Sequence, residues 1–200
     1  RNDMEPMKGG IPRQAVRRGA IPTLAGLMTS FLLVISAAPA LAASEIDIFD
    51  AARDGDNAAI AQYHAEGGDI AVTNSRGYTP FILAAYYGHT ESLVLLQKEG
   101  ADSCALDEKG SNAFMGVAFR GHDETAAWLL ANTGCDVNHR NYGGQTALMM
   151  ASLFGREAII EQLLDAGADP RVVDGQGNTA QSLAAAQGLS RVVTLVKFNM

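Results

Sequence analysis

Glycines recur along this chain with a nearly constant period, and no other feature restricts the fold as strongly. One series consists of Gly55, Gly88, Gly121, Gly155 and Gly188, whose positions differ by 33, 33, 34 and 33. Two further series keep the same register: Gly77, Gly110, Gly144 and Gly177, and Gly67, Gly100, Gly134 and Gly167. A period of this length is typical of repeat proteins, in which each unit is one supersecondary motif. The chain should therefore fold as a row of stacked units.

Each period predicts a turn, a helix, a second turn and a second helix. In the second unit, Thr79 is expected to cap a helix that begins at Pro80, because proline fits the first helical position. Gly88 should end that helix, since a helix commonly stops at a residue with positive φ. A second helix is predicted over residues 89–99. One additional residue within 131–133 should lengthen the corresponding helix of the next unit.

A recognisable set of short patterns accompanies the period. The chain contains Gly-x-Thr-Pro, paired alanines, Gly-His and Gly-Ala-Asp at Gly77–Pro80, Ala84–Ala85, Gly88–His89 and Gly100–Asp102. In these patterns the chain resembles the ankyrin repeat family over residues 44–196. The resemblance implies an all-α solenoid of helix-turn-helix units with short hairpin-like loops. It also implies a repeat domain over 43–200 with about five repeats including caps, at about 44–73, 74–106, 107–139, 140–172 and 173–200.

The chain departs from the family pattern at one position of every repeat. The histidine of the family's Thr-Pro-Leu-His motif, which braces neighbouring loops, is replaced by Ile82, Met115, Met149 and Ser182. We expect the methionines to fill the space as flexible apolar side chains. The fold should be retained with somewhat looser bracing between loops.

Residues 1–42 have the organisation of a secretory signal peptide. A basic n-region over 1–18 precedes an apolar h-region over about 24–38, and small residues lead up to Ala42. This order predicts cleavage after Ala42, which would place the repeat domain in the periplasm or outside the cell. A retained anchor in the inner membrane is the first alternative, although the apolar segment is short for a span. An organelle transit peptide is the second.

Composition and motif content argue against several function classes. The formal net charge of −7 disfavours a nucleic-acid partner. The sequence lacks a nucleophile elbow, a phosphate-binding loop and a dinucleotide fingerprint. His89 and His122 should lie one repeat apart, on the order of 10 Å, which is too far to share one metal ion. His64 and His139 have no ligand cluster at metal-binding spacing. We therefore predict no catalytic residues, no metal and no cofactor.

The two cysteines, Cys104 and Cys135, leave two possibilities open. In an oxidising compartment they could form a disulfide, provided that their Cα atoms lie within roughly 7 Å. Two buried or unpaired thiols are the favoured interpretation at this point.

The resemblance also implies a concave surface for a partner, made of loop tips and of side chains from the first helix of each repeat. The positions concerned carry many aromatic and cationic residues, which dominate protein interfaces. The predicted contact residues are Arg76, Tyr78, Tyr86, Tyr87, Lys109, Phe119, Arg120, Tyr142, Leu153 and Phe154. A competing interpretation packs Phe119, Leu153 and Phe154 against neighbouring repeats. Trp128 is assigned to the core.

These observations predict a monomeric, non-enzymatic module that binds another protein in the cell envelope. One alternative, which the family resemblance implies, is an envelope oxidative-stress accessory associated with a peroxide-detoxifying enzyme. Cys104, Cys135 and several methionines could be oxidised in such a role. The other is a membrane-tethered scaffold that retains the N-terminal segment, the only case in which a membrane would be a partner.

Overall fold

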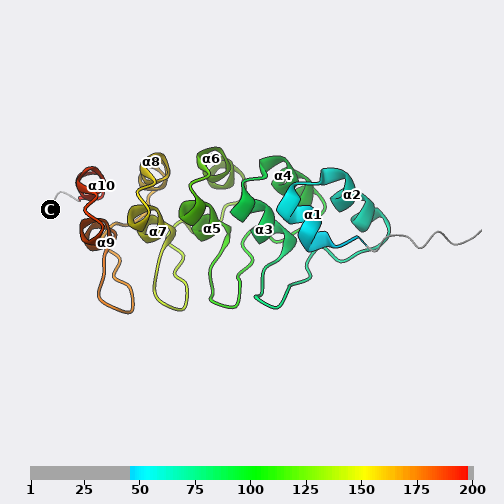
Figure 1. The fold of residues 1–200 in the computed structure, drawn as a ribbon, viewed down its shortest axis with the longest axis horizontal. Helices are drawn as coiled ribbons and strands as arrows, with labels where there is room; N and C mark the ends of the chain where they lie inside the picture. Colours follow the sequence, from blue (N-terminus) through cyan, green and yellow to red (C-terminus); the bar gives the residue numbers. More distant parts are fainter. Residues whose placement is uncertain (1–45, 198–200) are drawn as a thin grey trace, which may run out of the picture. The chain divides into compact units, whose positions relative to one another are not determined.

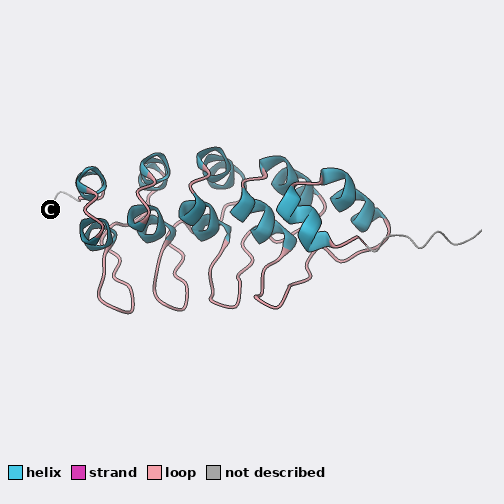
Figure 2. Cartoon of the chain, viewed as in Figure 1, coloured by secondary structure: helices cyan, strands magenta, loops and turns pink. Residues whose placement is uncertain are grey.

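A computed structural model describes residues 46–197, so the predicted signal peptide lies outside the described residues. Within this range the repeat domain contains ten α-helices and no strand (Figures 1 and 2). The helices are α1 (Ile48–Asp54), α2 (Asn57–Ala65), α3 (Pro80–Tyr87), α4 (Thr90–Lys98), α5 (Ala113–Arg120), α6 (Asp123–Asn132), α7 (Ala147–Leu153), α8 (Glu157–Asp165), α9 (Ala180–Ala186) and α10 (Ser190–Leu195). None of these helices is long and apolar enough to span a membrane.

Within the repeat domain the helices form two rows. Each odd-numbered helix packs against the next odd-numbered one, and the even-numbered helices pack in the same way in the second row. The hairpin loops that precede α3, α5, α7 and α9 extend away from both rows (Figure 1). This is the helix-turn-helix stacking that the glycine period predicts.

Local sequence signals set the helix boundaries. The Thr79 hydroxyl accepts a hydrogen bond from the Ile82 N–H, and Pro80 is the first residue of α3. Gly88 ends this helix with φ of 80°. Both predictions are thus confirmed. The predicted insertion is confirmed as well, because α6 has 10 residues where α4 and α8 have 9.

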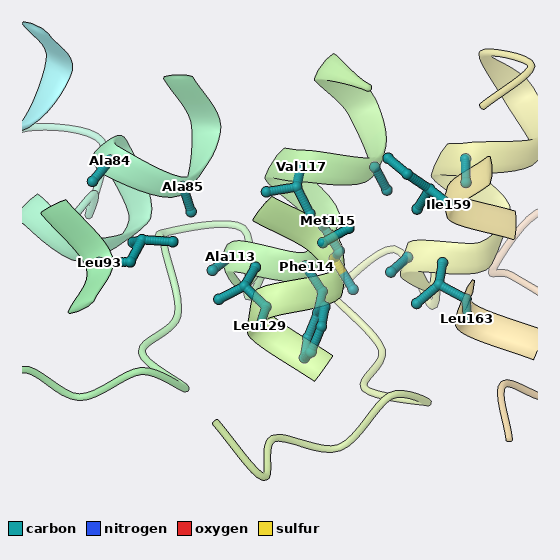
Figure 3. Packing of buried hydrophobic residues seen from close by; sticks show 14 of the residues in the cluster. Ala84, Ala85, Leu93, Ala113, Phe114, Met115, Val117, Leu129, Ile159 and Leu163 are labelled. Carbon is teal, nitrogen blue, oxygen red and sulfur yellow. The ribbon is translucent and has the colours of Figure 1, made fainter. Parts of the chain in front are cut away.

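The core lies between the two rows and along them. Small residues on the odd-numbered helices, such as Ala84 and Ala85, are fully buried and allow close helix approach, while Leu93 and Leu129 fill the space from the second row (Figure 3). Met115 and Met149 are buried at the positions of the missing motif histidine, as predicted. Trp128 packs against this core but is only half-buried, so its assignment to the core is confirmed in part.

Side chains just before the second helices connect each repeat to the one before it. His89 Nε2 lies 2.8 Å from the Arg53 carbonyl oxygen, and His122 Nε2 lies 3.1 Å from that of Tyr86. Arg156 replaces histidine in the next repeat and donates to the carbonyl oxygen of Phe119 at 3.2 Å. These bonds fix the spacing of α1, α3, α5 and α7, and the last three of these helices carry five of the ten predicted contact residues.

The hairpin loops are also joined directly to one another by backbone hydrogen bonds. Each hairpin turn begins with an Asn or Asp whose Oδ1 accepts backbone N–H groups two and four residues later; these residues are Asn74, Asp107, Asn141 and Asp174. Successive turns are linked by backbone bonds from Glu108 N to Arg76 O (3.2 Å), from Tyr142 N to Lys109 O (2.9 Å) and from Gly175 N to Gly143 O (2.8 Å). Neighbouring loops are therefore linked through backbone groups in repeats that lack the motif histidine, and the looser bracing expected without it stays a prediction.

Candidate partner-binding groove

A groove with a volume of about 390 Å³ runs along α3, α5 and α7 and the adjacent loops. Six of the ten predicted contact residues line it: Tyr78, Tyr86, Lys109, Phe119, Leu153 and Phe154. We call this feature the aromatic groove. The other four residues, Arg76, Tyr87, Arg120 and Tyr142, lie outside its lining. The structure thus gathers residues from three successive repeats into one site.

The aromatic rings form a continuous row at the C-terminal ends of α3, α5 and α7. Tyr86 stacks on Phe119 with ring centroids 6.0 Å apart, and Phe119 meets Phe154 edge-to-face at 4.7 Å. Phe119 and Phe154 nevertheless remain 38% and 40% exposed. Packing of Phe119 and Phe154 against neighbouring repeats is therefore confirmed, while the exposed parts of the rings leave contact with a partner as a prediction.

The cationic side chain of Arg120 lies next to this row of rings. Its guanidinium carbon lies 5.2 Å from the ring centroid of Tyr86 and 5.9 Å from that of Tyr87. Such stacking on aromatic faces is favourable and holds the planar guanidinium in a defined orientation. Tyr87 itself is 37% exposed beside the groove. The site therefore combines an apolar row with a positioned positive charge.

Loop residues form the other side of the site. Lys109 lines the groove, and Arg76 is exposed on the preceding turn. Tyr142 is 79% exposed at the tip of its turn, where the ring lies against Gly110 rather than in the groove. Tyr142 is thus presented to solvent, apart from the aromatic row.

Sequence reasoning missed the apolar floor of the groove. Ile82, Met115 and Met150 line it, and each precedes an aromatic residue of the row by four positions. Residues four apart lie on one face of a helix. This spacing is the signal that could have identified them.

The carboxylates of the hairpin turns are engaged in local structure. Asp107 Oδ1 accepts the backbone N–H groups of Lys109 and Ser111, both at 2.8 Å. At the equivalent position of the last turn, hydrogen bonds from the backbone N–H of Asn178 lower the pKa of Asp174. These acids stabilise turns, since a carboxylate that accepts N–H bonds favours its charged form.

The four histidines are engaged in structural contacts. His89 and His122 bond to carbonyl oxygens as described above, and His139 Nε2 lies 2.7 Å from the Gly110 carbonyl oxygen. His64 Nε2 lies 3.2 Å from a carboxylate oxygen of Glu99. Over residues 46–197, no three His, Cys, Asp or Glu side chains come together in a way that could hold a metal ion.

A disulfide joins Cys104 and Cys135, whose Cα atoms are 5.6 Å apart. The two residues lie in the segments that follow α4 and α6, so the bond connects neighbouring repeats. The favoured interpretation as two unpaired thiols is contradicted by this bond. Cys104 is exposed and Cys135 half-buried, which also differs from a buried pair.

Known proteins resemble this chain over its repeats. A family model described as "Ankyrin repeats (3 copies)" matches residues 48–141 and 114–199. Similar relatives include the inactive serine/threonine-protein kinase TEX14 of Bos taurus, 39% identical over 70 residues that make up 35% of this chain and 5% of the relative. The E3 ubiquitin-protein ligase XBAT33 of Arabidopsis thaliana is 42% identical over 69 residues, 34% of this chain and 14% of the relative. The putative ankyrin repeat protein YahD of Escherichia coli (strain K12) is 34% identical over 73 residues, 34% of this chain and 36% of the relative.

The matched segments cover well under two thirds of each relative's own length, so the likeness concerns the repeats. Ankyrin repeats are generally protein–protein interaction modules, and the family is typically non-enzymatic. The family model spans most of the described residues and agrees with the stacked helix pairs. This chain belongs to the ankyrin repeat family.

Proposed function

We propose that this protein is a non-enzymatic binding module of the cell envelope that holds another protein on its aromatic groove. The observation that carries the proposal is the exposed row formed by Tyr86, Phe119 and Phe154. The rings are fixed by mutual contact, yet Phe119 and Phe154 are each more than a third exposed. An apolar surface of this kind on a soluble protein favours a binding site.

The residue types in the groove suit tight protein recognition. Tyrosine, tryptophan and arginine contribute most of the energy at protein interfaces, and the groove combines tyrosines with Arg120 beside them. Its volume of about 390 Å³ lies at the lower end of the range of ligand pockets. A cleft of this size accommodates a few side chains of a partner.

Two features support a location outside the cytoplasm. Residues 1–42 carry the pattern of a signal peptide, which predicts a mature chain that begins at Ala43. The Cys104–Cys135 disulfide connects two repeats of the domain, and disulfides persist mainly in oxidising compartments such as the periplasm. We therefore propose export to the periplasm or beyond the cell.

An affinity capture experiment tests the binding function. The full chain with a C-terminal tag is expressed with its N-terminal segment intact, and partners are captured from envelope extract and identified by mass spectrometry. A Phe119→Ala/Phe154→Ala variant is compared with Val94→Ala, which alters an exposed apolar residue outside the groove. The identified partner is then purified for titration by calorimetry.

We expect the wild type and Val94→Ala to bind the partner equally, and the double variant to bind at least about tenfold more weakly, as interface anchors do. Both variants should keep the wild-type circular dichroism spectrum, because the substituted side chains are partly exposed. The proposal would be falsified if every specific partner bound the double variant with wild-type affinity.

A further inference from the structure

The cationic side chains of the repeat domain divide into two groups. Residues 46–197 contain ten Lys and Arg against nineteen Asp and Glu. Ion pairs engage Arg53, Lys98, Arg171 and Arg191. Arg140 and Arg156 donate to backbone carbonyl oxygens. Four cations have neither kind of partner among the described residues: Arg76, Lys109, Arg120 and Lys197.

One of these four unengaged cations lines the aromatic groove, and two others lie on a helix and a turn beside it. Lys109 lines it, and Arg120 follows Phe119 and stacks on Tyr86. Arg76 lies on the turn whose backbone bonds to the turn of Lys109, because the Arg76 carbonyl oxygen accepts the Glu108 N–H. The surplus of positive charge here contrasts with the acidic remainder of the domain.

The acidic groups beside the groove do not cancel this charge. Asp107 lines the groove, but its carboxylate is held by the two backbone N–H groups of its own turn. Glu108 follows Asp107 in the same turn, and it is exposed without an ion pair within the described range. The three cations are therefore accompanied by a single carboxylate, that of Glu108, that is not held by hydrogen bonds of its own turn.

The tyrosine hydroxyl groups add further donors. Within residues 46–197 the hydroxyls of Tyr78, Tyr86 and Tyr87 make no hydrogen bond. Guanidinium and ammonium groups donate hydrogen bonds and accept none, whereas carboxylates only accept. A ligand that supplies acceptors at the rim and apolar groups at the centre would satisfy both parts of the site.

We propose that the groove takes an acidic segment of the partner protein. An aromatic or leucine side chain of this segment enters the row of Tyr86, Phe119 and Phe154, and Asp or Glu side chains flanking it pair with Arg76, Lys109 and Arg120. This inference rests on the proposed function. A nucleic acid would also supply acceptors, but its phosphates recur along the whole strand and would extend past the three cations over the acidic remainder of the domain. An acidic segment of a protein can confine its negative charges to the groove.

The test uses a phage library of random dodecapeptides, selected on the full chain immobilised through a C-terminal tag. We expect the recovered peptides to carry at least two Asp or Glu close in sequence to an aromatic residue or leucine. The best peptide is synthesised, and its Kd is measured by fluorescence anisotropy at low and at physiological salt concentration. A single-stranded DNA oligonucleotide is titrated in parallel.

Variants of the charged residues separate the contribution of charge attraction to the affinity from that of apolar packing. Lys109→Gln/Arg120→Gln should raise Kd about tenfold. Arg120→Lys, made in the wild type, should retain much of the affinity because it keeps the charge. Glu108→Gln should lower Kd about two- to threefold, since it removes a repulsive carboxylate. Affinity should be higher at the lower salt concentration because charge attraction is screened less.

The outcomes distinguish this inference from the function on which it rests. Neutral or basic peptides that require Phe119 and Phe154 but tolerate Lys109→Gln/Arg120→Gln would overturn the acidic assignment and leave the binding function standing. Retention of the DNA oligonucleotide through the same cations would also overturn it. Peptides that all bind the Phe119→Ala/Phe154→Ala variant unchanged would overturn both.

Discussion

At the scale of single residues, His122 joins two repeats, and its burial between them lowers its pKa. Because a carbonyl oxygen only accepts hydrogen bonds, the contact with Tyr86 O places a proton on His122 Nε2. Burial lowers the pKa of His122, and it outweighs this hydrogen bond, which acts in the opposite direction. The nearby positive charges of Arg120, His89 and Arg156 lower the pKa further. The folded protein therefore binds a proton at His122 more weakly than the unfolded chain does.

This difference predicts a loss of stability in mild acid. As pH falls below the ordinary histidine pKa of about 6.5, the unfolded chain takes up a proton that the folded state resists, so the free energy of unfolding decreases. Urea unfolding at pH 7.5 and 5.5 should show a smaller decrease for His122→Gln than for the wild type. An NMR titration should place the His122 midpoint below 6.5. A midpoint at or above that value would contradict the prediction.

At the scale of helices and turns, Gly88 ends α3 and receives the His122 ring of the next repeat. A Cβ atom at this position would lie 2.7 Å from His122 Nδ1, whereas a Cβ at Gly134 would meet nothing within 4 Å. Both glycines have positive φ, 80° and 66°. Substitution by alanine thus strains the backbone at either site but creates a collision only at Gly88.

We expect Gly88→Ala to destabilise the protein by about 1–2 kcal/mol more than Gly134→Ala, as overpacking in a tight contact does. The backbone penalty of roughly 1–2 kcal/mol is common to both variants and cancels in the comparison. Urea unfolding monitored by circular dichroism measures the difference. Equal losses would show that the ring moves aside without cost.

The disulfide is a second link between elements, and its removal should be measurable. It joins positions separated by 31 in the sequence, just after the ends of α4 and α6. Closing a loop of this length restricts the unfolded chain, so Cys104→Ser/Cys135→Ser should lower the free energy of unfolding by about 2–4 kcal/mol. A reductant should destabilise the wild type to a similar extent and leave the serine variant unchanged. A wild-type protein that reductant leaves equally stable would contradict this.

The elements were largely predictable because their signals are local. Thr79, Pro80 and Gly88 mark the start and end of one helix within a short stretch of chain, and a single shift in the glycine register locates the insertion at 131–133. The disulfide was harder to predict because periodicity does not relate its two residues. In the repeat register Cys135 corresponds to Ala101, not to Cys104. The bond joins different positions of two neighbouring repeats, and these positions come together only when the repeats stack.

The same distinction applies to the aromatic groove. Its ring-bearing residues sit at repeat positions that the family resemblance marks as variable, so Tyr86, Phe119 and Phe154 could be named from the sequence. The loop connections could not, because they use backbone groups such as Tyr142 N and Lys109 O that carry no sequence signature. The sequence therefore does not reveal which backbone groups link neighbouring loops.

At the scale of the whole molecule, the predicted signal peptide and the disulfide together predict how the protein is processed. Export exposes the chain both to a signal peptidase and to an oxidising compartment. When the gene is expressed in bacteria with its natural N-terminal segment, envelope protein should begin at Ala43 and contain no reactive thiol. Protein made without positions 1–42 stays in the cytoplasm, where Cys104 and Cys135 should both react with a thiol reagent.

Intact mass and thiol alkylation of the two preparations separate the remaining possibilities. A membrane-bound product that keeps positions 1–42 but has no reactive thiol indicates an anchored domain that faces the oxidising side. Uncleaved, fully alkylated protein in the cytoplasm would contradict export altogether. The two readouts depend on different parts of the chain, since cleavage requires only the N-terminal segment and the disulfide requires stacked repeats. Agreement between them would therefore tie the location of this protein to its fold.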